Sequence, residues 1–83
     1  MRIYVGNLNF ATTDEGLREL FEQHGEVVSA QVVTDRETGR SRGFGFVEMK
    51  DEEAGSKAVE ALDQQVFEGR TLTVDKAKPR GRR

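Results

Sequence analysis

Residues 42–49 read RGFGFVEM, and the rest of the chain is interpreted from this stretch. Side chains alternate between the two faces of a β-strand, so Phe44 and Phe46 share one face with Arg42 and Glu48. The opposite face carries glycine, valine and methionine, a set suited to a core. Burying the phenylalanines instead would bury both charged residues, which is costly unless they are paired. The stretch therefore predicts two rings on a half-solvated face, where exposed apolar surface indicates a binding site.

A second stretch near the start of the chain shows the same alternation. Residues 3–8 read IYVGNL, which places Ile3 and Val5 inward and Tyr4 outward. If the two strands are neighbours, Tyr4 joins the two phenylalanines on one face. Bases of single-stranded nucleic acid stack on such rings while arginine holds the phosphates.

Together the two stretches resemble the RNP2 and RNP1 submotifs of the RNA recognition motif family. The RNP1 pattern is Lys or Arg, Gly, aromatic, Gly or Ala, Phe, Val, any residue, aromatic. Residues 42–49 match every defined position except the last, where Met49 replaces the aromatic residue. Position 49 falls on the core face, so we expect this difference to alter packing and leave the binding face unchanged. The resemblance covers residues 1–77, and the short chain with its basic tail looks like the small single-domain RNA-binding proteins of bacteria and the glycine-rich group. A domain excised from a longer protein would look the same.

The first half of the remaining chain predicts a helix and a hairpin. Thr12 or Thr13 can cap a helix of about three turns that ends near Gly25. Residues 27–34 are rich in β-branched side chains and predict a strand with a bulge between positions 27 and 30. Residues 35–41 predict a solvated loop that leads into the strand of Phe44.

The second half predicts one more helix and one more strand. Asp51 can cap a helix, and residues 63–69 then turn, with a short strand at positions 66 and 67. Residues 70–76 alternate again. The buried positions predicted here are Ala54, Ala58, Ala61 and Leu62 in the helix, and Leu72 and Val74 in the strand.

The resulting element order is βαββαβ, the split βαβ arrangement. The fold class is α+β, a ferredoxin-like sandwich of one four-stranded antiparallel sheet with two helices on one face. Right-handed crossovers make the first and third strands central neighbours, so that Tyr4, Phe44 and Phe46 converge on the open face.

Composition indicates one domain with segregated charge. The 83 residues carry 13 basic and 15 acidic side chains and no cysteine, and the formal net charge is −2. That balance alone argues against a nucleic-acid binder. Acidic residues, however, concentrate in the two predicted helices, and basic residues gather around positions 36–42 and 76–83. We expect a recognition motif over residues 1–77, a flexible basic tail over 78–83, and a cytoplasmic protein, or a nuclear one in a eukaryote.

The resemblance implies non-catalytic binding of single-stranded RNA by a monomer, with single-stranded DNA as a weaker ligand and no cofactor, metal or membrane. Tyr4 and Phe44 would each stack a base, Phe46 would pack against a sugar or between two riboses, and Arg42 would pair with a phosphate. Arg36 and Arg40 are further candidates for phosphate contacts. The predicted rim and tail contacts are Asn7, Gln31, Glu48, Lys76, Ala77, Lys78 and Arg80.

Other interpretations remain open at this point. A protein-interaction module would use the acidic helical face, and the presence of all three rings counts against it. An acylphosphatase-like enzyme would need an anion-binding loop with arginine after the first strand, and residues 7–10 supply none. Gly43 and Gly45 lack the further glycines and lysine of a phosphate loop, so we expect them to permit close packing of the helices behind the strand. His24 has no partner pattern that indicates chemistry.

Overall fold

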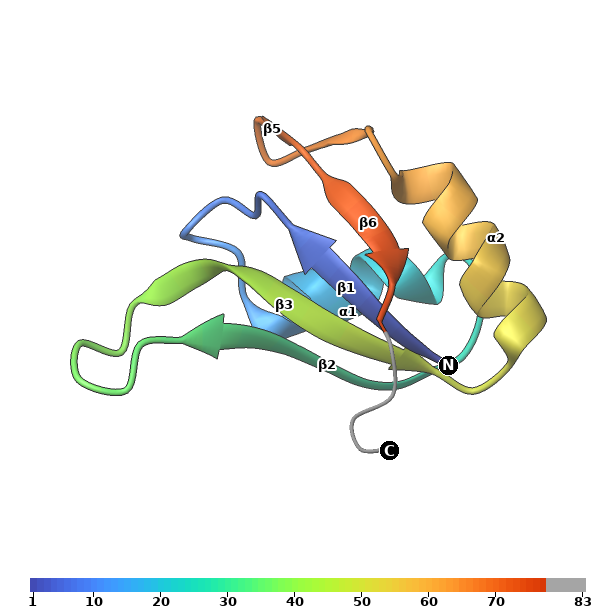
Figure 1. The fold of residues 1–83 in the computed structure, drawn as a ribbon, viewed down its shortest axis with the longest axis horizontal. Helices are drawn as coiled ribbons and strands as arrows, with labels where there is room; N and C mark the ends of the chain where they lie inside the picture. The colour runs from blue at the N-terminus through green and yellow to red at the C-terminus, as the bar shows by residue number, and fades with distance from the viewer. Residues whose placement is uncertain (78–83) are drawn as a thin grey trace.

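The computed structural model describes residues 1–77 and contains one four-stranded antiparallel sheet in the order β2-β3-β1-β6. Two helices cover one face of this sheet and leave the other open (Figure 1). Helix α1 packs on β2 and β3, and α2 packs on β6, β3 and β1. The predicted order and the central position of β1 and β3 are confirmed. The elements are β1 (Arg2–Gly6), α1 (Asp14–Glu22), β2 (Val27–Thr34), β3 (Ser41–Met49), α2 (Glu52–Leu62), β4 (Val66–Phe67), β5 (Arg70–Thr71) and β6 (Thr73–Lys76).

The core lies between the helices and the covered face of the sheet. Strands β1, β3 and β6 turn every second side chain toward this core, as their alternation predicts, while the bulged β2 buries Val27 and Val32. Met49 is 1% exposed, which confirms that the unusual RNP1 position faces the core. The core contains Ile3, Val5, Leu8, Leu17, Phe21, Val27, Val32, Val47, Met49, Ala58, Leu62, Leu72 and Val74.

Helix α1 begins at one of the two threonines that the sequence offers. The hydroxyl of Thr13 accepts a hydrogen bond of 3.0 Å from the backbone N–H of Gly16, so Thr13 is the N-cap. Thr12 is buried instead, and its hydroxyl bonds to the carboxylate of Glu68. Asp51 occupies the N-cap position of α2 but makes no capping hydrogen bond through its side chain.

The predicted buried stripe of α2 is wrong at one position. Ala61 is exposed, while Gly55, Ala58 and Leu62 are the buried residues of the helix. These three follow the spacing of one helical face, which places Ala61 beside that face. The side chain of Met1 covers Gly55, where a Cβ atom would lie 2.3 Å from the Met1 sulfur.

The interpretation of the β3 glycines is also wrong. A Cβ atom at Gly45 would lie 2.5 Å from the carbonyl oxygen of Gln31, so this glycine allows close approach of strand β2, not of a helix. The pairing of β2 with β3 shifts register between Val27 and Ser29, which confirms the expected bulge, and shifts again beyond Val32. Gly43 has a φ of +84° and faces Phe10.

The last predicted strand is divided in two. Arg70 and Thr71 pair with β4 in a small hairpin, whose short first strand was predicted, and Thr73–Lys76 pair with β1. Leu72 lies between them, and its N–H donates to the carbonyl of Gln65 over 2.8 Å. The predicted tail, residues 78–83, lies outside the described residues. Within residues 1–77, no helix combines the length and apolarity that crossing a membrane requires.

Candidate nucleic-acid interface

Three aromatic rings meet at the centre of the open face. Strand pairing places Tyr4 opposite Phe46 and Gly6 opposite Phe44. The ring centroids lie 5.9–6.2 Å apart, and each ring is partly exposed. The Tyr4 and Phe44 planes are tilted by 34°, whereas Phe46 meets Phe44 edge-on at 88°. We call Tyr4, Phe44 and Phe46 the platform.

The ring of Tyr4 lies along the backbone of Gly6. A Cβ atom at Gly6 would be 2.6 Å from the Tyr4 hydroxyl oxygen and 2.9 Å from two ring carbons. Any larger residue at position 6 would have to displace the ring. The absence of a side chain there therefore lets Tyr4 lie close to the sheet, with its opposite face directed outward.

Arg2 adds a charged group to the platform that sequence reasoning missed. Its guanidinium carbon lies 4.4 Å from the centroid of Phe46, a cation–π contact. Strand pairing sets Arg2 opposite Glu48, yet within residues 1–77 no ion pair joins them. The signal was available in the sequence, because Arg2 has the same strand parity as Tyr4. One face of Phe46 is therefore covered by a cation.

The rim of the platform carries polar side chains from the outer strands. Gln31 lies opposite Phe46 on β2 and is exposed, as is Glu48 on β3. Asp75 lies opposite Tyr4 on β6, a position that sequence reasoning did not include. Hydrogen-bond acceptors thus flank the rings on both sides.

Lys76 does not lie with the rings. It pairs with Ile3, a core-facing position, and its exposed side chain lies near Glu52 and Ser56 of α2. Alternation along β6 places Asp75 on this face instead, and the predicted contact of Lys76 with RNA stays a prediction. The N–H of Ala77 donates to the carbonyl of Arg2 over 2.9 Å, which continues the pairing of β6 with β1.

Asn7 makes three hydrogen bonds within the protein. Its amide oxygen accepts hydrogen bonds from Nε and Nη2 of Arg70, at 3.2 and 2.6 Å. Its amide nitrogen donates to the carbonyl of Thr71 over 2.6 Å. Asn7 therefore ties the end of β1 to the β4–β5 hairpin, and its predicted contact with a base stays a prediction.

Arg42 is the second residue of β3, next to the β2–β3 loop, and its side chain is exposed. In that loop, backbone N–H groups of Thr38 and Glu37 lower the pKa of the Asp35 carboxyl, and the charge of Arg42 lowers it further. Arg36 and Arg40 are exposed in the same loop. The loop therefore presents both signs of charge at one end of the platform.

Comparison with known proteins identifies this arrangement. The sequence matches the RNA recognition motif over residues 3–73. The chain belongs to the RNA recognition motif family. It is 51% identical over 80 residues to the putative RNA-binding protein RbpE of Nostoc sp., covering 96% of this chain and 81% of that protein. It is 49% identical over 80 residues to glycine-rich RNA-binding protein 7 of Arabidopsis thaliana, covering 96% of this chain and 46% of the relative. The expected resemblance to both groups is confirmed.

Other relatives are longer, and solved structures share the fold. The 31 kDa chloroplastic ribonucleoprotein of Nicotiana sylvestris is 56% identical over 82 residues, which are 99% of this chain and 26% of the relative. The crystal structure of RNA-binding protein PG1 superposes with a TM-score of 0.94 at 56% identity and covers 99% of both chains. The Rna15 motif with bound RNA (GU) superposes with a TM-score of 0.84 at 28% identity, over 94% of this chain and 83% of that one. The chain spans less than half the length of the first four curated relatives.

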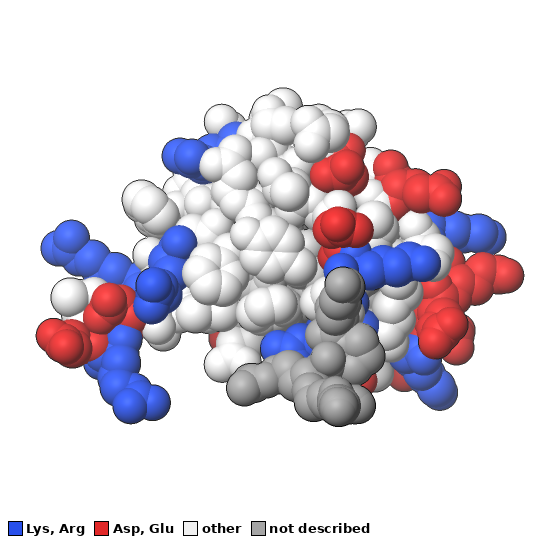
Figure 2. Space-filling view, in the orientation of Figure 1, with Lys and Arg blue, Asp and Glu red and all other residues white. Residues whose placement is uncertain are grey.

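Charge is distributed unevenly over this RNA recognition motif. The middle of the open face is uncharged in Figure 2, while charged side chains gather over the β2–β3 loop at the left and over α2 at the right. The aromatic surface thus lies apart from the acidic residues of α2, while Glu48 and Asp75 flank it.

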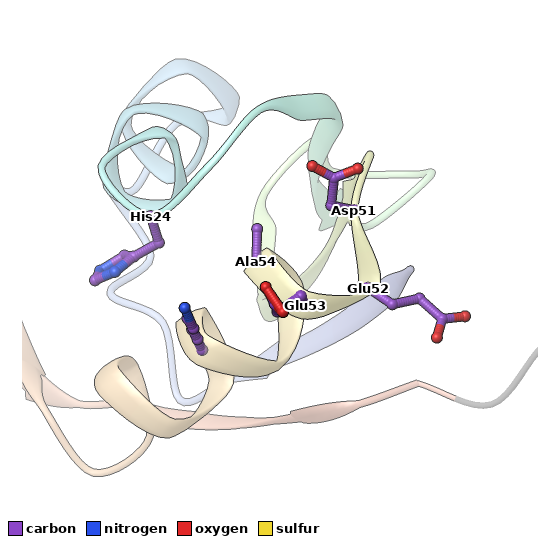
Figure 3. A pocket seen from close by; sticks show the side chains of 6 residues that line it. His24, Asp51, Glu52, Glu53 and Ala54 are labelled. Atoms are coloured by element: carbon purple, nitrogen blue, oxygen red, sulfur yellow. The ribbon is translucent and has the colours of Figure 1, made fainter.

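A hollow on the helical side of the motif does not bring its side chains together as the platform does. It is lined by His24, Asp51, Glu52, Glu53, Ala54 and Lys57. Figure 3 shows the side chains of His24, Asp51 and Glu52 pointing in different directions rather than toward one centre. Within residues 1–77, no three His, Cys, Asp or Glu side chains lie together as metal ligands would.

Proposed function

We propose that this chain binds single-stranded RNA on the open face of its sheet and catalyses no reaction. The observation that carries the proposal is the convergence of the partly exposed rings of Tyr4, Phe44 and Phe46 at the centre of the open face. Exposed rings of this kind stack bases. Family membership and relatives named as RNA-binding proteins support it. The alternative, a protein-interaction module, is not favoured because all three platform rings are present.

The ring orientations suggest separate roles. Tyr4 and Phe44, 6.0 Å apart, each offer an outer face to a base. Phe46 stands edge-on to Phe44 with Arg2 over it, which suits contact with sugars and leaves the guanidinium for a phosphate. Arg42 is exposed at the end of β3 and would hold a second phosphate.

Base edges would be read from the rim. Gln31 offers an amide with both donors and acceptors, and Glu48 and Asp75 offer carboxylates. These three flank the platform from β2, β3 and β6. The carbonyl oxygen of Ala77 adds an acceptor at the end of β6. Lys78 and Arg80 remain proposed contacts that lie outside the described residues.

The partner would be single-stranded RNA, bound by a monomer, with single-stranded DNA bound more weakly because contacts to the 2′-hydroxyl would be lost. The proposed location is the cytoplasm. Several relatives are named as chloroplastic, and the Nostoc relative is bacterial in type.

Intrinsic fluorescence tests this function directly. Tyr4 is the single tyrosine of the chain, and there is no tryptophan, so tyrosine emission reports the platform alone. We expect titration with single-stranded RNA to quench this emission. The dissociation constant from the quenching should equal the one measured independently with labelled RNA. Double-stranded RNA of the same sequence should compete poorly, since its bases are not free to stack. Binding that leaves Tyr4 emission unchanged would place the site elsewhere.

A further inference from the structure

The two outer strands of the sheet are held on one side by a neighbouring strand and on the other by an aspartate. Strands β2 and β6 form the edges of the sheet, and β1 and β3 lie between them (Figure 1). The outer edge of such a strand presents backbone groups that no further strand pairs. On each edge strand of this protein, one outward N–H donates to a carboxylate from the helical layer.

The first of these contacts joins α1 to β2. Asp14 is the first residue of α1, and its Oδ1 accepts a hydrogen bond of 2.8 Å from the N–H of Val32. Val32 is 6% exposed, so without this carboxylate its N–H would be left without a partner at a mostly buried position. The preceding residue is Gln31, which lies opposite Phe46. The carbonyl oxygen of Gln31 lies against β3, 2.5 Å from where a Cβ atom of Gly45 would be. The segment around Gln31 is therefore held from both sides.

The second contact joins α2 to β6. Asp63 is the C-cap residue of α2, and its Oδ1 accepts a hydrogen bond of 2.9 Å from the N–H of Val74, which is 2% exposed. A negative charge at the C-terminal end of a helix opposes the helix dipole, so α2 itself gains nothing from an acid there. The residue after Val74 is Asp75, which lies opposite Tyr4. The contact with β6 therefore accounts for this aspartate better than the helix does.

The two contacts share one geometry. In each, a carboxylate from the helical layer binds the N–H of a core valine, and the adjacent residue on the same strand flanks a platform ring. Strands β1 and β3 are paired on both sides, so the rings should stay in place when an aspartate is removed. An outer strand that loses its second anchor can shift relative to the rings.

We propose that Asp14 and Asp63 are positioning residues for base recognition, which fix the outer strands so that Gln31 and Asp75 meet the edges of bases on the platform. This inference rests on the proposed function. Each aspartate acts through its strand and not by contact with RNA. Removing it should therefore change which base is preferred more than how strongly the rings stack a base, because base-edge contacts specify sequence.

Base preference measures this role. Affinities are measured for short RNAs that contain only A, C, G or U, and the ratio between the best and the poorest ligand is compared among variants. We expect Asp14→Ala and Asp63→Ala each to reduce this ratio about fivefold, which corresponds to one hydrogen bond of about 1 kcal/mol. Asp14→Asn and Asp63→Asn should keep the wild-type ratio, because an amide oxygen can accept the same hydrogen bond. An unchanged ratio in the alanine variants, or a reduced one in the asparagine variants, would overturn the inference.

Double-mutant cycles identify the strand through which each aspartate acts. Asp14→Ala should have no further effect on base preference in the Gln31→Ala background, and Asp63→Ala should have none in the Asp75→Ala background. The crossed pairs, Asp14 with Asp75 and Asp63 with Gln31, should be additive. A merely structural role would instead lower the affinity for all four RNAs by the same factor and would add in every background.

Two further variants control for charge. Glu15→Ala removes the same charge from the first turn of α1, and Glu60→Ala removes it from the last turn of α2. Both should leave the base preference unchanged. Thermal melting checks that every variant is folded.

Amide hydrogen exchange tests the two contacts without any substitution. In the wild-type protein the N–H groups of Val32 and Val74 should exchange slowly, because both are hydrogen-bonded and mostly buried. Rapid exchange at these positions would show that the aspartates do not hold the outer strands, and would overturn the inference even if an alanine variant did not fold.

The emission of Tyr4 separates failure of this inference from failure of the proposed function. If RNA quenches Tyr4 and the wild-type protein binds all four RNAs equally, the rim does not read bases and this inference fails while the proposed function stands. If no RNA quenches Tyr4, the proposed function itself fails.

Discussion

The open face and the helical face both expose polar and charged side chains, but they organise them differently. On the open face, the centroids of three rings lie within 6.2 Å of one another. On the helical face, His24 and the acidic residues of α2 diverge around a hollow (Figure 3). A binding surface thus differs from a solvated surface in that its side chains point to one place and can contact one ligand together. The number of polar or aromatic side chains does not decide this. For the same reason a chain of net charge −2 can present a nucleic-acid surface.

The strongest test of this contrast removes the platform rings. Tyr4→Ala and Phe44→Ala should each weaken binding of single-stranded RNA by about 1–3 kcal/mol, because each removes the stacking of one base. Both rings are partly exposed, so the fold should persist. Fluorescence anisotropy of labelled RNA measures the affinity, and Glu53→Ala on the helical face serves as a control without effect. A folded double variant that binds as tightly as wild type would remove the basis for the proposed site.

A more specific test addresses how Tyr4 is oriented. Gly6→Ala should weaken RNA binding by about 1 kcal/mol, near the lower end for one stacked base. The new methyl group would meet the far end of the Tyr4 side chain, which can move without unfolding the sheet.

A double-mutant cycle isolates this effect from general damage. If Gly6 acts through Tyr4, Gly6→Ala should have no further effect in the Tyr4→Ala background. Gly16→Ala in α1 is the matched control, since its Cβ would meet only the Thr13 hydroxyl at 3.3 Å. Equal losses in both backgrounds would show that Gly6 does not set the plane of the ring.

The charge on the platform is tested through the salt dependence of binding. Arg2→Gln should weaken binding by about 0.5–1 kcal/mol through loss of the exposed cation–π contact. It should also reduce the slope of log affinity against log salt by about 0.7, the value for one phosphate contact to a single strand. Lys57→Gln removes the same charge from the helical face and should leave the slope unchanged. An unaltered slope in Arg2→Gln would mean that this guanidinium only covers Phe46 and contacts no phosphate.

The smallest effect on binding is expected at the unusual RNP1 position. Met49→Phe should change the melting temperature, because a larger side chain in a well-packed core costs about 1–3 kcal/mol. RNA affinity should stay within error, since Met49 is 1% exposed on the covered face of β3. A change in affinity with unaltered stability would contradict the assignment of faces.

Local patterns in the sequence determined the faces of the strands and the order of the elements. Side-chain alternation is a property of each strand alone, so Tyr4, Phe44 and Phe46 could be placed outward and Met49 inward before any contact was known. Such patterns could not decide whether Thr12 or Thr13 is the N-cap of α1. It depended on Glu68, which lies 56 residues away from Thr12.

Only the tertiary structure decided how individual side chains are used. Asn7 bonds to Arg70 because the chain returns to it after 63 residues, and the register between β1 and β6 sets Asp75 opposite Tyr4. Three further contacts likewise depend on folding and on the orientation of each side chain. They are Arg2 with Phe46, Tyr4 with Gly6 and Phe10 with Gly43. Strand periodicity determines which side of the sheet a residue occupies. Which atoms lie within contact distance there is set by strand pairing and packing between distant segments.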